Sequence, residues 1–154
     1  KDTLTLINNH LESNKLTKED KVVYESILAA PERDKVESGA RLLLGKLAEA
    51  SALRAPQADA IAQAVQKSVH PYIIVCGDFN DTPLSYTYRQ LSRKLTDSFI
   101  EKGRGIGNTY IGEFPSFRID YVLHSPTLYT VGYIREDITL SDHYPIKVKI
   151  RKGS

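Results

Sequence analysis

Three short polar clusters lie at the ends of β-type runs, which limits this chain to folds in which several strand ends carry functional side chains. The clusters occupy residues 77–80, 118–120 and 141–143. The first follows the apolar run 72–76, and the third precedes the alternating segment 146–150. Short apolar runs and period-two alternation are both typical of strands. We therefore expect the three clusters to lie at strand ends that face one cleft.

The clusters and one segment near the start contain side chains suited to phosphate chemistry. They supply three acids, one amide and two imidazoles, which are Asp78, Asp120, Asp142, Asn80, His10 and His143. Metal-assisted attack on a phosphate ester needs an activated water, stabilisation of the developing negative charge and help for the departing oxygen. These residue types can fill those roles, so the sequence favours phosphoester hydrolysis.

The same residues resemble a known family. In order and type, His10-Leu11, Gly-Asp-Phe-Asn at 77–80, Arg-Ile-Asp-Tyr at 118–121 and Ser-Asp-His-Tyr-Pro at 141–145 resemble the later motifs of the endonuclease/exonuclease/phosphatase superfamily. The resemblance implies the deoxyribonuclease-I-like fold, a four-layered α/β sandwich with two facing sheets and helices outside. Family members usually begin with strands that carry an Asn and a Glu at the metal, whereas this chain enters a predicted strand at 3–8. We therefore expect residues 1–154 to be the C-terminal part of an incomplete domain, inactive by itself.

The resemblance also implies catalytic roles. Asp78 would orient or deprotonate the attacking water, and Asn80 would donate to a phosphate oxygen from the same side of the strand end. His143 would contact the scissile phosphate, with Asp120 hydrogen-bonded to it and fixing its tautomer. The alternatives are a tight turn at 77–80 in which Asp and Asn bond their own backbone, and an exposed turn at 142–143. For Asp120, the alternative is a surface salt bridge with Arg118.

Asp142 and His10 carry the remaining expectations. Asp142 resembles the metal-ligating acid of the family, and Mg²⁺ or Mn²⁺ suits carboxylate and water ligands better than zinc does. His10 resembles the second imidazole, which usually pairs with an acid from the first half of the domain. A histidine that satisfies a strand end is the alternative for His10. His70 and His124 match no motif.

Helical patterns separate the first strand from the later motifs. Thr17 and Asp20 resemble a helix capping pair, and Pro31 ends this first helix. An apolar stripe predicts a second helix over 34–54, Pro56 punctuates the chain, and a third stripe covers 58–65. A short helix is expected at 86–95, and strands at 121–123, 128–134 and 145–150.

The glycine-rich segment 102–116 is expected to be a loop near the catalytic strand ends. Its candidate substrate contacts are Arg104, Asn108 and Tyr110, and Arg118 follows the loop. The glycines do not have dinucleotide-binding spacing, and the loop could equally be a plain connector.

Composition leaves the substrate open. The net charge is +2 with 26% charged residues, so no large basic excess indicates extensive contact with a nucleic-acid backbone. The expected partner is a phosphate ester, whether nucleic acid, phospholipid or inositol-phosphate headgroup, or small phosphodiester. A non-catalytic interaction module of the same fold is the alternative function. An uncovered apolar sheet face would also allow self-association.

Overall fold

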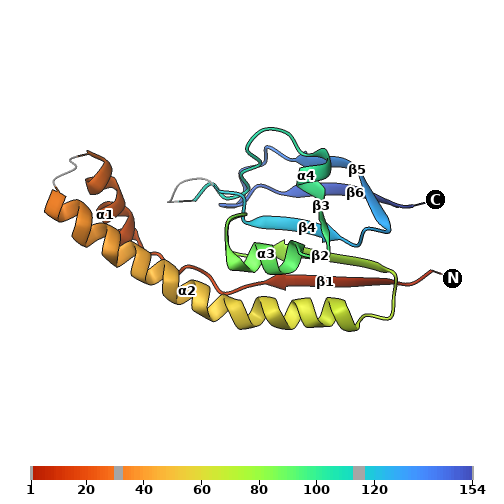
Figure 1. The fold of residues 1–154 in the computed structure, drawn as a ribbon. Coiled ribbons are helices and arrows are strands. Elements are labelled where there is room, and N and C mark those ends of the chain that lie inside the picture. Colours follow the sequence, from red (N-terminus) through yellow and green to blue (C-terminus); the bar gives the residue numbers. More distant parts are fainter. Residues whose placement is uncertain (1, 30–32, 113–116, 154) are drawn as a thin grey trace.

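The computed structural model describes residues 2–29, 33–112 and 117–153 as a mixed α/β fold (Figure 1). Its elements in chain order are β1 (Leu4–His10), α1 (Lys18–Ala29), α2 (Arg33–Lys67), β2 (Tyr72–Asp78), α3 (Tyr86–Ser92), β3 (Thr96–Asp97), α4 (Ser98–Lys102), β4 (Asp120–His124), β5 (Leu128–Arg135) and β6 (Ile146–Lys152). Four strands form one sheet in the order β1-β2-β4-β3, and β5 pairs with β6 in a second sheet.

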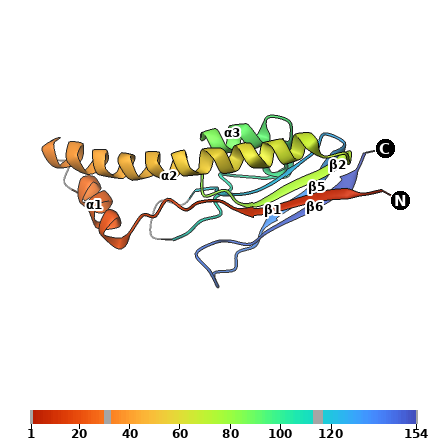
Figure 2. The same cartoon turned by 90° about the horizontal axis from the view of Figure 1, so that it is seen from below.

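Helices α2 and α3 cover one face of the four-stranded sheet. Strand alternation directs Ile73 and Val75 of β2 and Leu123 of β4 toward this face, where they are buried with Ala58 of α2 and Leu91 of α3. The hairpin β5-β6 lies on the other side of the sheet (Figure 2). Burial of apolar side chains between helices and sheet is the main stabilising contribution to such a core, about 25 cal/mol for each Å² removed from water. The core therefore holds the strand ends in place.

The face of β1 opposite the helices remains partly uncovered, as expected from the sequence. Leu4 and Leu6 alternate with inward residues and are 46% and 60% exposed. Together with the two separate sheets, this uncovered apolar surface is consistent with part of a deoxyribonuclease-I-like fold.

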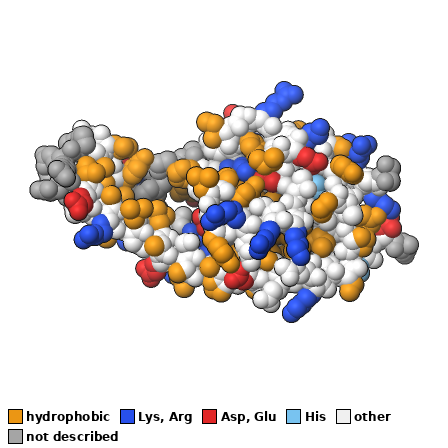
Figure 3. Space-filling model, in the orientation of Figure 1, with side chains coloured by type: hydrophobic (Ala, Val, Ile, Leu, Met, Phe, Trp, Pro, Cys, Tyr) orange, Lys and Arg blue, Asp and Glu red, His pale blue; other side chains and the backbone are white. Residues whose placement is uncertain are grey.

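Helix α1 and the first half of α2 project away from the sheet as an arm (Figures 1 and 2). The predicted capping pair is confirmed at its start, because the Thr17 N–H donates to Asp20 Oδ2 at 2.8 Å and the Asp20 N–H donates to Thr17 Oγ1 at 3.4 Å. Figure 3 shows hydrophobic side chains spread over the surface of the arm. The exposed hydrophobic residues of α1 and the first half of α2 include Val22, Leu28, Leu42 and Leu44.

The predicted break at Pro56 is wrong, because α2 runs through Pro56 as one helix. A proline inside a helix removes one backbone hydrogen bond and costs about 3 kcal/mol. Here Arg54 and Ala58 on either side of Pro56 are both buried against the body of the protein. These tertiary contacts outweigh the local cost.

Two further elements differ from the sequence expectation. The pair β3-α4 immediately precedes the predicted loop and was not anticipated. Its helix begins at an N-cap in which the Asp97 carboxylate accepts the N–H of Phe99 at 2.8 Å. The loop then begins at Gly103, and its residues 113–116 lie outside the described residues. Pro31, which was predicted to end the first helix, also lies outside them. Among the described residues, no helix is both long and apolar enough to cross a membrane.

Candidate active site

Strand pairing places three of the predicted site residues in one row. His10 at the end of β1 pairs with Asp78 at the end of parallel β2, and Asp78 pairs with Asp120 at the start of antiparallel β4. Paired residues on neighbouring strands point to the same face of a sheet. The row lies on the face away from the helices, because its neighbours in alternation, Val75 and Tyr121, are buried in the core.

Gly77 allows the first two strands to approach closely at this point. Its φ of +131° is unfavourable for residues with a side chain, and a Cβ there would collide with the carbonyl oxygen of Asn9. Strand β2 ends one residue later, at Asp78. The glycine therefore brings the ends of β1 and β2 together where the acid and the imidazole stand.

Asn80 lies in a turn beyond the strand rather than on it. Its φ is +52°, its N–H donates to Asp78 Oδ1 at 2.7 Å, and its side-chain amide donates to the Leu11 carbonyl at 2.9 Å. The strand alternation used to orient Asn80 therefore does not reach it, and the side chain is buried against the segment after β1. The turn fixes the orientation of the Asp78 carboxylate, while phosphate contact by Asn80 stays a prediction.

His143 reaches the row from the loop before β6. Its backbone forms a bridge with Tyr110, whose ring meets the imidazole edge-on at 5.3 Å. The predicted hydrogen bond between His143 and Asp120 is present, with Nδ1 and Oδ2 separated by 2.8 Å. An imidazole that donates through Nδ1 to a carboxylate presents Nε2 to the site.

Asp78 Oδ2 lies between two imidazole nitrogens. It is 3.6 Å from His10 Nε2 and 3.9 Å from His143 Nε2. These separations exceed a direct hydrogen bond, so a water or a substrate oxygen could join the groups. Ligand atoms of Asp78, Asp120 and His143 also lie within 4.8 Å of one another, which is close enough for one metal ion. Two carboxylates and one imidazole suit a divalent cation.

The electrostatics of the row favour a bound proton or cation. Burial raises the pKa of Asp78, and the charge of Asp120 adds to this, against the hydrogen bond from Asn80 and the two imidazoles. For His143, burial acts to lower the pKa, but the hydrogen bond to Asp120 and the charges of Asp120, Asp78 and Asp142 outweigh it and raise the pKa. Burial is thus the main cause of the raised Asp78 pKa, whereas neighbouring negative charge raises the pKa of His143.

We expect the raised pKa of His143 to depend on Asp120. In metal-free protein, Asp120→Asn should shift the NMR titration midpoint of the His143 ring to lower pH, since the hydrogen-bonded charge is lost. A raised histidine pKa stabilises the fold fully below the ordinary value near 6.5, and this contribution disappears as pH rises through the folded-state pKa. The variant should therefore lose part of this pH dependence, whereas Glu25→Gln on exposed α1 should not. An unchanged midpoint in Asp120→Asn would contradict the assignment.

Asp142 stands apart from the row. Its side chain is exposed and accepts a hydrogen bond from Ser141 Oγ at 3.1 Å, and it does not belong to the Asp78, Asp120 and His143 group. Its carbonyl accepts the N–H of Ile111 at 2.8 Å, which ties the His143 loop to the glycine-rich loop. Metal ligation by Asp142 stays a prediction.

The predicted substrate contacts lie in different surroundings. Tyr110 contacts the His143 ring, while Arg104 and Asn108 line an open hollow beside the loop. Arg118 points into the core, where it pairs with Asp97 at 2.6 Å and lies over the Phe99 ring at 4.6 Å. This geometry gives no support to a substrate contact by Arg118, and the alternative salt bridge with Asp120 is absent among the contacts of the described residues.

Sequence reasoning missed two residues that hold the site. Buried Thr109 accepts the N–H groups of Ile119 and Asp120 at its hydroxyl, each at 3.1 Å. Buried Arg54 of α2 donates to Asp81 Oδ2 at 3.1 Å and to Asn14 Oδ1 at 2.8 Å, which links the segments after β2 and β1. The sequence signal for Arg54 is its spacing, because it stands four residues from both Ala50 and Ala58 and so shares their face of the helix. The structure buries all three residues.

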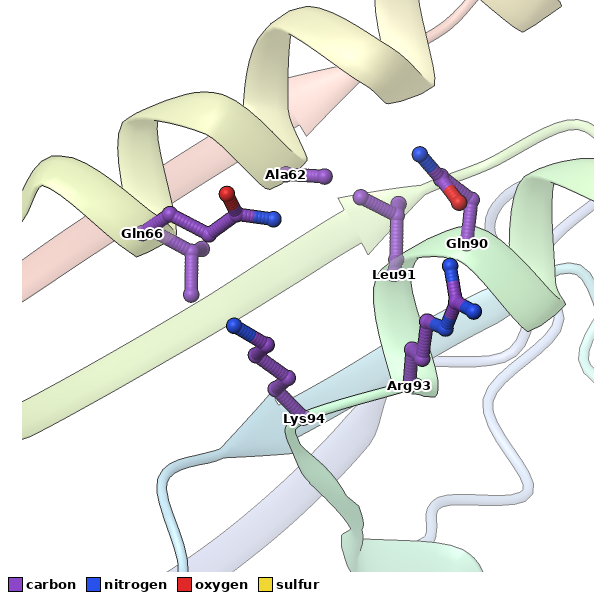
Figure 4. A pocket seen from close by; sticks show the side chains of 7 residues that line it. Ala62, Gln66, Gln90, Leu91, Arg93 and Lys94 are labelled. Carbon is purple, nitrogen blue, oxygen red and sulfur yellow. The ribbon is translucent and has the colours of Figure 1, made fainter.

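A small pocket on the helix side of the sheet is separate from these residues. It has a volume of about 40 Å³ and lies between α2 and α3 (Figure 4). Its lining includes Ala62, Gln66, Leu91 and Arg93 and contains none of the predicted site residues. A pocket this small has room for little more than a few waters.

Comparison with known proteins agrees with this geometry. The sequence profile of the Endonuclease/Exonuclease/phosphatase family matches residues 21–143. Similar solved structures include a conserved protein of unknown function from Enterococcus faecalis V583 (15% identity, TM-score 0.59, covering 67% of this chain and 46% of that one). Others are a family protein from Bacteroides vulgatus (21%, TM-score 0.58, 67% and 45%) and a Neisseria 3′ phosphatase bound to a product DNA hairpin (18%, TM-score 0.53, 69% and 55%).

The chain thus spans about half of the length of these solved structures. At these identities, structural likeness shows the fold alone. No curated protein sequence matches the chain. The profile match covers most of the sequence and includes the polar clusters at the strand ends. The chain belongs to the endonuclease/exonuclease/phosphatase family.

Proposed function

We propose that the protein of which this chain is a part hydrolyses phosphate esters with the help of a divalent metal ion. The observation that carries this proposal is the row in which Asp78 Oδ2 lies 3.6 and 3.9 Å from two imidazole nitrogens, with Asp120 bonded to the second imidazole. Such a row can take a proton from water and hold positive charge beside a phosphate. Membership of the family supports the same reaction class.

Each group has a distinct proposed role. Asp78, oriented through Oδ1 by the Asn80 N–H, uses Oδ2 to orient or deprotonate the attacking water. His143 contacts the scissile phosphate through Nε2, and Asp120 aligns its imidazole and favours the protonated form by raising its pKa. His10 is 75% exposed at the side chain and contributes a second imidazole next to Asp78.

The residues present fit a hard divalent ion. Mg²⁺ or Mn²⁺ would offset the repulsion between Asp78 and Asp120, and would stabilise negative charge on the phosphoryl group. Two placements are compatible with the donors. In the first, the Asp78, Asp120 and His143 group would hold the ion, and His143 would bind the metal instead of the phosphate. In the second, Asp142 would hold it with ligands from elsewhere in the protein, and His143 keeps its proposed role. Manganese binding followed by electron paramagnetic resonance separates them, since Asp142→Asn weakens binding only in the second.

The proposed reaction belongs to the whole domain rather than to residues 1–154. This chain spans about half of its structural relatives, and we propose that it is the C-terminal part of the domain. The test compares hydrolysis of bis-p-nitrophenyl phosphate and plasmid DNA by the full-length protein and by this chain, with Mg²⁺ or Mn²⁺ and with chelator. Metal-dependent hydrolysis by the full-length protein alone is expected. Absence of hydrolysis of any phosphate ester tried would count against the proposal.

Non-catalytic interaction is the second candidate, and exposed apolar surface favours it. On the sheet, Leu4 and Leu6 are uncovered on the face away from the helices, so two copies of this chain could associate there. Light scattering at high concentration tests this. Dimers that disappear in Leu6→Lys support association through the sheet, and a monomer at every concentration excludes it.

A further inference from the structure

An open hollow of about 490 Å³ lies between the loop after α4 and the end of β5, and several of its described lining residues are cationic. Lys102, Arg104 and Arg135 line it, and none of the lining residues that the structure describes is acidic. Among the contacts of the described residues, none of these three cations forms an ion pair. Cations that share one hollow, and that are not paired with acids among the described residues, attract anions.

Two nearby acids, Glu101 and Glu136, are engaged with other groups. Glu101 accepts the N–H of Thr130 at 2.8 Å and lies 3.0 Å from the His124 ring, while Glu136 pairs with Lys147 at 2.8 Å. These two carboxylates are therefore paired with groups other than the cations of the hollow.

The hollow and the site share one junction. Asn108 lines the hollow, the next residue, Thr109, holds the backbone of Asp120, and Tyr110 contacts His143. Arg135, which also lines the hollow, places its guanidinium over the ring of Tyr144 at 4.0 Å. Tyr144 directly follows His143 in the chain. A ligand held at His143 could therefore extend past this junction into the hollow.

The lining also offers apolar surface. Ile106 is 87% exposed and Ile134 is 53% exposed, and both line the hollow together with the Phe99 ring. Exposed apolar residues next to cations suit a ligand whose anionic group is attached to a carbon framework. A bare inorganic anion would use only the charges.

We propose that this hollow binds a second phosphate group of the substrate, separate from the phosphate that is attacked. This rests on the proposed phosphoesterase function for the identity of the substrate, but the anion site itself can be measured without hydrolysis. Phosphate matches both Arg104 and Arg135, because guanidinium groups bind phosphate oxygens through paired hydrogen bonds. The substrate would then carry at least two phosphates joined by a short framework.

NMR titration of this chain with inorganic phosphate at constant ionic strength tests the anion site. Saturable shifts are expected in the amides of Arg104, Asn108 and Arg135. The double variant Arg104→Gln/Arg135→Gln should weaken binding at least about tenfold, whereas Arg93→Gln removes a charge on the helix side and should leave it unchanged. His143→Ala should also leave these shifts in place. Absence of saturation, or equal loss in Arg93→Gln, overturns the site.

Bisphosphates test whether both phosphates belong to one ligand. A nucleoside 3′,5′-bisphosphate or inositol 1,4-bisphosphate should shift both the hollow amides and the His143 ring, and at least one should bind about tenfold more tightly than inorganic phosphate. The tighter of the two indicates a nucleotide or an inositol framework. If neither binds more tightly than phosphate, the second-phosphate proposal is wrong. Hydrolysis by the full-length protein without phosphate binding in the hollow would overturn this inference while leaving the proposed function intact.

Discussion

Replacing His143 with alanine should lower kcat/KM of the full-length protein for bis-p-nitrophenyl phosphate by about 10³-fold. The His143 imidazole lies 3.9 Å from Asp78 Oδ2 and is also hydrogen-bonded to Asp120. General acid-base groups typically raise the reaction rate by about 10²–10⁴-fold. Asp120→Asn should lower kcat/KM by about 10²-fold, because the amide can still accept the hydrogen bond from Nδ1 but no longer stabilises the imidazolium.

The two losses should not multiply in the double variant, because Asp120 acts through His143. His70→Ala is the matched control, since His70 lies before β2 and belongs to no part of the row. Full activity in His143→Ala would remove this residue from the reaction. Circular dichroism of each variant establishes that a lost activity is not a lost fold.

Gly77→Ala should reduce the free energy of unfolding of this chain by about 3 kcal/mol or more. The residue has φ of +131°, and an added Cβ would collide with the Asn9 carbonyl on the neighbouring strand. Strained backbone of this kind costs about 1–3 kcal/mol, and the displaced strand pairing adds to it. Urea denaturation monitored by circular dichroism measures the change.

Gly45→Ala is the matched control for this substitution. Gly45 lies inside α2, and a Cβ there would have no heavy atom within 4 Å. Alanine in an exposed helix position should stabilise the chain by about 0.5–1 kcal/mol. Opposite signs at the two glycines are expected, and a neutral Gly77→Ala would show that β1 and β2 can separate without loss of stability.

Local sequence patterns predicted several parts of this molecule correctly. The β1, β2, β4, β5 and β6 strands, the capping pair at Thr17 and Asp20 and the short helix α3 follow from periodicity, capping and turn residues, which act between near neighbours. The polar clusters also identified the family and the hydrogen bond between Asp120 and His143. Each of these depends on residue type and order along the chain.

Contacts between distant segments decided the rest. Continuous α2 depends on burial of Arg54 and Ala58 around Pro56, which no local propensity contains. Arg118 is close to Asp120 in the sequence, but its side chain lies in the core, where it pairs with Asp97 and packs over aromatic rings from other elements. The hydroxyl of Thr109 became a support for Asp120 only because the loop folds back onto β4.

The row of site residues illustrates this division most clearly. The amino-acid order shows that His10, Asp78 and Asp120 stand at strand ends, and nothing local says which strands are neighbours or in which register. Pairing of β1 with β2 and of β2 with β4 aligned the three residues, and this register follows from burial of one sheet face under α2 and α3. A shift by one residue would turn the acids into the core, so burial of the distant apolar side chains sets the geometry of the site.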